Sequence, residues 1–201
     1  MSDLTPAIVG ILDEMNDSYQ KTAPEAGGFG QVGWPPANSV YPAIVKSMTV
    51  IAETKVFAGK GNDPIKCPAI RFSYETLPDV SDPTVDPENA KIYKFEGVKL
   101  DLIPPSALTG DLADTSKGIG WVLGRNAGRL KGILAAITGD EDMPLPQAIA
   151  TVQELIEGDA AVGVNLFIDK YDRKDKNTDT VIETTYTEFA RGGLDISDFD
   201  S

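Results

Sequence analysis

The chain has 201 residues, a formal net charge of -13 and 41% hydrophobic residues, which suits one domain with a hydrophobic core. It contains no His, which excludes an imidazole general base, a Ser–His or Cys–His dyad and a His-ligated zinc site. The single cysteine, Cys67, excludes an intramolecular disulfide and a CxxC motif. We therefore expect no metal centre, no cofactor and no enzyme activity.

No apolar run is long enough to cross a bilayer, and the first residues lack the pattern of a signal peptide. We expect a soluble protein of the cytoplasm with no membrane partner. The net charge opposes long-range attraction to a polyanion. However, acidic residues gather at the two ends of the chain, so basic clusters can remain in the middle.

The first part of the chain is predicted to be an extension of the main domain. Residues 4–20 place apolar side chains near helical spacing, which predicts a short amphipathic helix. Residues 21–38 are rich in Gly and Pro, which is typical of a linker. We therefore treat 1–38 as a flexible N-terminal segment.

The pattern then predicts strands, helices and strands in that order. β-Branched and aromatic residues dominate five segments, which are 39–53, 67–77, 91–103, 160–171 and 179–190. Helical spacing of apolar residues between the third and fourth of these segments predicts two helices, over about 119–138 and 146–157. Residues 39–190 thus form the domain, and residues 191–201 form an acidic C-terminal tail.

Five strands with helices after the third are the order of an OB-fold, a small Greek-key barrel. Three consecutive strands argue against alternating parallel βαβ units. The fold class is therefore mainly β (α+β), with a five-stranded OB-fold-like Greek-key barrel. A general α+β sandwich with the same order is the alternative.

Four segments carry a resemblance to a family. They are YPAIVKSMTV in the first strand, GRNAGRLKGILAAITG in the first long helix, TVIETTYTEFARG in the last strand, and the tail LDISDFDS. Over residues 39–201 the chain resembles phage-encoded single-stranded-DNA-binding proteins of the OB-fold type. The resemblance implies non-sequence-specific binding of single-stranded DNA in phage replication or recombination. It also implies that the tail recruits replication or recombination proteins, through Asp195, Asp198, Phe199 and Asp200.

Binding of a single strand needs aromatic faces for base stacking and cations for phosphates. The aromatic candidates lie in the second, third and fourth strands and are Phe72, Tyr74, Tyr93, Phe95 and Tyr171. Strands 2 and 3 supply the usual binding face of an OB-fold. Because Phe72 and Tyr74 share one face, as do Tyr93 and Phe95, the alternative is that these pairs form the core.

The cationic candidates lie in the loops on either side of the expected binding cleft. They are Lys55, Lys60 and Lys66 in the loop after the first strand and Arg173, Lys174 and Lys176 in the last hairpin, and Arg71 in the second strand is added to them. With Lys170, the last hairpin has four cations and four carboxylates, so a solvated tip is an equally good interpretation.

The first long helix has two stripes at a spacing of four residues. One carries Trp121, Arg125 and Arg129, which could hold phosphates and a base or could simply pair with carboxylates on the surface. The other consists of glycines, which suggests a close backbone contact with the sheet or with a second copy, and hence a possible homo-oligomer.

The charge also permits other functions. A protein-interaction module or DNA mimic would use the acidic surface, and a virion structural protein would use the N-terminal segment and the glycine stripe for subunit contacts. An enzyme is the class with the least support, since no spacing selects a pair of carboxylates for acid–base work.

Overall fold

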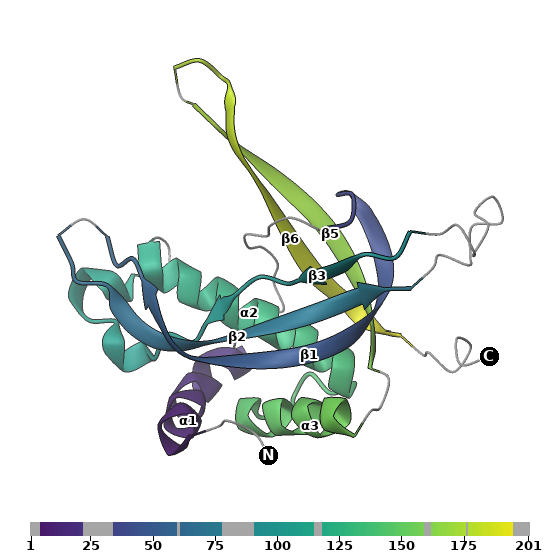
Figure 1. Cartoon of the computed structure of the whole chain (residues 1–201). Helices are drawn as coiled ribbons and strands as arrows, with labels where there is room; N and C mark the ends of the chain where they lie inside the picture. The colour runs from purple at the N-terminus through teal and green to yellow at the C-terminus, as the bar shows by residue number, and fades with distance from the viewer. Residues whose placement is uncertain are drawn as a thin grey trace.

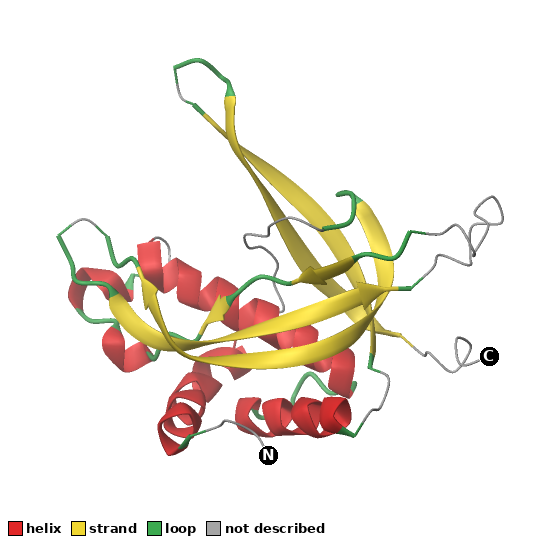
Figure 2. Cartoon of the chain, in the orientation of Figure 1, coloured by secondary structure: helices red, strands yellow, loops and turns green. Residues whose placement is uncertain are grey.

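The computed structural model describes residues 5–21, 34–59, 61–77, 91–114, 118–158, 162–175 and 177–194. The protein is a mixed α+β structure with a six-stranded antiparallel sheet and three helices among these residues (Figures 1 and 2). The elements in chain order are α1 (Pro6–Lys21), β1 (Ser39–Val56), β2 (Ile65–Thr76), β3 (Lys94–Glu96), β4 (Leu100–Asp101), α2 (Gly118–Thr138), α3 (Leu145–Glu157), β5 (Gly163–Lys174) and β6 (Val181–Leu194).

The strands follow a Greek-key order. Neighbouring strands run β3-β2-β1-β5-β6, and β4 pairs with β2 beside β3. After the helices, the chain returns so that β5 lies next to β1, as the fourth strand of a Greek key does. The predicted order of strands, then helices, then two further strands is therefore observed, with four strands before the helices where three were expected.

The expected barrel is not closed. The two end strands of the order, β3 and β6, do not pair with each other. The single strand expected over 91–103 is divided into β3 and β4, which pair separately with β2. Gly97 lies at the break, where an added Cβ would lie 2.6 Å from Oε1 of Glu188 and 2.7 Å from the ring of Tyr74. The break thus brings β6 side chains against the connection between β3 and β4.

Side chains, and not strand pairing, link these two edges of the sheet. The carboxylate of Glu188 on β6 accepts a hydrogen bond from the N–H of Val98 at 2.9 Å. The ring of Trp34 lies 4.7 Å from the ring of Phe95 on β3 and 6.2 Å from that of Tyr186 on β6. The curved sheet is therefore held across an open seam.

The three helices lie together at one side of the sheet (Figure 2). Helix α2 packs on β6, and α1 packs on both α2 and α3. None of the helices in the described part of the chain has the length and apolar character to span a membrane.

Helix α1 is part of the core, in contrast to the expected flexible segment. Its buried side chains are Ile8, Leu12, Met15 and Tyr19. It is also fixed by polar contacts: Oδ1 of Asn16 accepts the N–H of Leu145 at 2.8 Å, at the start of α3. The sequence showed the apolar face of this helix but not the surface that covers it. The rest of segment 1–38 is described only from Trp34 onward.

Candidate functional site

An open hollow of about 570 Å³ lies beside β2 and β3. Its lining comes from the loop before β1 and from three strands, and consists of Trp34, Lys46, Ser73, Tyr74, Glu75, Lys94, Phe95 and Glu96. We call this hollow the β2–β3 groove. It lies on the part of the sheet where the sequence predicted the binding face.

The alternation of β2 explains how polar side chains reach the groove. Ile70, Phe72 and Tyr74 are fully buried in the core, whereas Arg71 and Ser73 are half-buried on the opposite face. On the groove side, the hydroxyls of Ser47 and Ser73 are 2.6 Å apart across β1 and β2. Backbone alternation therefore sends the rings of Phe72 and Tyr74 inward and the polar side chains of β2 to the opposite face. Residues of both faces border the groove, because Tyr74 and Phe95 line it together with Ser73 and Glu75.

Charged side chains in and beside the groove are partly paired. Arg71 contacts Glu96 at 2.6 Å, and Lys94 contacts Glu75 at 3.1 Å. Lys46 lies at a β-bulge of β1, is exposed, and has no ion-pair partner among the described residues. The lining has two cations and two carboxylates, and Arg71 beside it adds a third cation, in a strongly acidic protein.

Trp34 supplies the aromatic wall of the groove, and the sequence analysis missed it. The residue is half-buried, packs on Phe95 and lies in the segment that composition marked as a linker. A large aromatic side chain is costly to leave in water, so a Trp within a segment of Gly and Pro could have indicated that this segment packs on the domain.

Four predicted site residues are buried, and two of them, Tyr74 and Phe95, border the groove with almost no exposed surface. Phe72 and Tyr74 are each 1% exposed and Phe95 is 5% exposed, so the alternative that these aromatic residues form the core is correct for them. Burial raises the pKa of Tyr74 well above its usual range. Arg129 is 2% exposed, because its side of α2 packs on β6 and does not face solvent.

Arg129 forms a buried ion pair. Its Nη2 lies 3.0 Å from Oε2 of Glu188, and both side chains are 1% exposed. The same nitrogen donates to the backbone oxygen of Glu188 at 3.3 Å. Burial raises the pKa of the Glu188 carboxyl, and the guanidinium opposes this rise. The pair joins α2 to β6 directly behind the seam.

The other predicted residues are not brought together in the groove. Tyr93 is half-buried, with the ammonium of Lys91 at 4.7 Å from its ring. Trp121 is 47% exposed on α2, and the guanidinium of Arg125 lies 4.3 Å from its ring. Tyr171 is 69% exposed on the β5–β6 hairpin.

The predicted loop cations are only partly described. Lys55 is exposed, Lys66 contacts Glu53 at 3.2 Å, and Lys174 contacts Asp179 at 3.2 Å. Several predicted residues lie outside the described part of the chain, and they are Lys60, Lys176, the side chain of Arg173, and tail residues Asp195, Asp198, Phe199 and Asp200.

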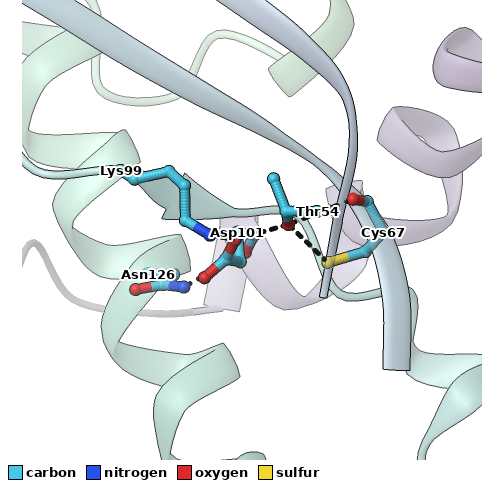
Figure 3. Close-up of polar contacts among 5 residues, drawn as sticks. All are labelled: Thr54, Cys67, Lys99, Asp101 and Asn126. Carbon is cyan, nitrogen blue, oxygen red and sulfur yellow. Dashed lines mark hydrogen bonds and ion pairs between the residues drawn. The ribbon is translucent and has the colours of Figure 1, made fainter. Parts of the chain in front are cut away.

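A polar cluster at the opposite end of β2 is structural (Figure 3). Thr54 donates to Asp101 at 2.7 Å, and Lys99 contacts the same carboxylate at 2.8 Å. Asn126 on α2 donates to the backbone oxygen of Asp101 at 3.1 Å. Cys67 beside Thr54 is buried, and burial raises the pKa of its thiol, which is unlike a nucleophile. The cluster fixes β1, β2 and β4 to α2.

The chain matches no protein-family model, no curated protein and no solved structure.

Proposed function

We propose that the protein binds single-stranded DNA without sequence preference, in the β2–β3 groove of an OB-fold-like sheet. The Greek-key order, with helices between the short strands β3 and β4 and the long strand β5, supports the OB-fold interpretation. The biological setting that the resemblance implies is replication or recombination of phage DNA in the host cytoplasm. The tail would there recruit partner proteins.

The observation that carries the proposal is that Trp34 lines the same groove as two lysines. Trp34 lines the groove together with Lys46 and Lys94, and Arg71 on β2 contacts Glu96, another lining residue. Base stacking on an aromatic ring contributes about 1–3 kcal/mol per base and accepts any base. One aromatic wall with nearby cations is therefore suited to a short stretch of single strand.

The charge balance of the groove sets the expected strength of binding. The groove region has three cations, two of which contact carboxylates. For single strands, the slope of log K against log salt is about -0.7 for each phosphate neutralised. We therefore expect a slope no steeper than about -2, and weak binding at physiological salt. A slope this shallow would distinguish binding in a local groove from binding along a long basic track, which neutralises more phosphates.

The test is fluorescence anisotropy with labelled poly-dT at about 50 and 300 mM salt. Lys46→Glu should weaken binding by about tenfold, because it removes the groove cation that has no ion-pair partner in the described part of the chain and adds a negative charge. Lys21→Glu on α1 makes the same change in net charge at an exposed position and should alter binding by less than about twofold. Equal effects of the two variants would reduce the binding to a general charge effect and refute the groove.

The tail requires its own arm of this experiment. Deletion of residues 195–201 removes three carboxylates, and it should tighten binding at low salt if the tail competes with DNA. If the full chain and the shortened chain both fail to bind at low salt, the DNA-binding proposal is wrong.

A further inference from the structure

The outer half of the β5–β6 hairpin leaves the body of the protein. β1 pairs with β5 only from Gly163 to Ile168, and β5 then continues to Lys174 with β6 as its sole partner among the described strands. Figure 1 shows this hairpin extending away from the sheet and the helices. We call residues 169–174 and 181–187 the arm. Along the arm, the edge of β5 that pairs with β1 at residues 163–168 has no partner strand among the described residues.

The arm exposes apolar surface that a solvated hairpin does not need. Tyr171 is 69% exposed, Ile182 59% and Val181 46%. Two-stranded ribbons are marginally stable in water, and an unpaired strand edge is a template for another strand. These properties are typical of an element that is covered by a partner.

The charges along β5 specify which partner fits. Residues 169–173 read Asp-Lys-Tyr-Asp-Arg, so each charge has its opposite at the same distance on the other side of Tyr171. In an antiparallel pair of two such strands centred on Tyr171, Lys170 lies opposite Asp172 of the second copy. Asp169 likewise lies opposite Arg173 of the second copy. The twofold axis repeats both oppositions, giving four pairs of opposite charge.

The direction of the backbone groups agrees with this register. The oxygen of Ile168 accepts the N–H of Asn38 on the β1 side of the strand, so positions 170 and 172 direct their backbone groups to the same edge. Positions 170 and 172 would then form hydrogen-bonded pairs, and Tyr171 would lie in the closer, non-hydrogen-bonded pair. In the single chain, the N–H of Lys170 donates to the carboxylate of Asp169 at 2.7 Å. This side-chain bond occupies the N–H that would pair with a second strand in the dimer.

We propose that the protein forms a homodimer through antiparallel pairing of the β5 arm with the same arm of a second copy, centred on Tyr171. A register centred on Asp172 would place Lys170 opposite Lys174 and Asp172 opposite itself, and repulsion excludes it. The contact uses a different part of the sheet from the β2–β3 groove and does not depend on DNA binding.

A symmetric disulfide tests the register directly. Opposed Cα atoms in a non-hydrogen-bonded antiparallel pair are about 4.5 Å apart, within the range that a disulfide spans. Tyr171→Cys should therefore give a covalent dimer on mild oxidation of the full-length protein. Ile182→Cys is the control, because it is exposed on the same arm and equally open to oxidation. It lies on β6, away from the proposed twofold axis, so this variant should stay monomeric. The buried Cys67 should give no dimer in the wild-type protein.

The second measurement is the dissociation constant of the dimer, determined by sedimentation equilibrium for variants that exchange the charges at positions 170 and 172. Lys170→Asp places like charges opposite each other twice and should weaken the dimer by about tenfold. Adding Asp172→Lys to that variant restores opposite charges and should return the dissociation constant to within about threefold of wild type. A wild-type protein that stays monomeric, equal crosslinking of the two cysteine variants, or a double variant no better than the single one would each overturn the proposal.

Discussion

The buried ion pair between Arg129 and Glu188 offers a quantitative test of how the seam of the sheet is held. Both side chains are 1% exposed, and Glu188 also accepts the N–H of Val98 across the seam. Arg129→Met keeps most of the side-chain volume but leaves the carboxylate buried without its cation. Breaking a buried pair from one side costs about 3–5 kcal/mol, and we expect a loss of this size in the free energy of unfolding at pH 7.

The loss should depend on pH in a direction that the structure determines. Burial already raises the pKa of Glu188, and Arg129 opposes this rise, so the pKa is higher still in Arg129→Met. A carboxyl with a raised pKa in the folded state binds its proton more tightly there than in the unfolded chain. The free energy of unfolding therefore increases as the pH falls through the folded pKa toward the unfolded value, by about 1.4 kcal/mol per unit of pKa difference.

Urea unfolding followed by tryptophan fluorescence measures both effects, and two variants act as controls. Arg125→Met changes the same residue type on the same helix at a half-buried position and should cost less than about 1 kcal/mol. The double variant Arg129→Met, Glu188→Gln removes both charges and keeps an oxygen for Val98, so it should lie within about 1 kcal/mol of wild type or above it. The reasoning is refuted if Arg129→Met costs less than about 1 kcal/mol at pH 7, or if its deficit does not shrink on acidification.

Three further variants or reactions test local features. Gly120→Ala should destabilise the protein by about 1–3 kcal/mol, because the new Cβ would meet the backbone before α2. Gly124→Ala has open space around the new Cβ and should stabilise the protein by up to about 1 kcal/mol. Thermal unfolding compares the two variants. Asn16→Ala removes the acceptor at the start of α3 and should cost about 1 kcal/mol in urea unfolding. Cys67 should react with a thiol reagent at pH 8 only as fast as the protein opens, because burial restricts access and raises the pKa of the thiol; fast reaction in native buffer would contradict this placement.

Much of the fold could be predicted from local patterns, and the errors concern long-range contacts. Strand and helix types and their order follow from periodicity within each segment. Periodicity does not predict the packing of α1 into the core or the division of 91–103 at Gly97. They depend on contacts with residues distant in sequence, such as Leu145 and Glu188, which no local pattern encodes.

The candidate site shows the same limit. Alternation establishes that Phe72 and Tyr74 share a face but does not say which face is covered. The deciding information was on the other face, because Arg71, Ser73 and Glu75 together are a polar surface that a core would not accept. A strand with aromatic residues on one side and charges on the other therefore places its rings inward.

The same argument fails for Arg129 on helix α2, for a physical reason. Arg129 shares its stripe with the exposed Trp121, so the helical pattern predicts a surface position. It is nevertheless buried, because Glu188 on β6 compensates its charge. Such a pair costs desolvation on both sides and is favourable only when both partners are present. Local patterns identify the faces of neutral segments, whereas a buried charge can be placed only when its counter-charge is known.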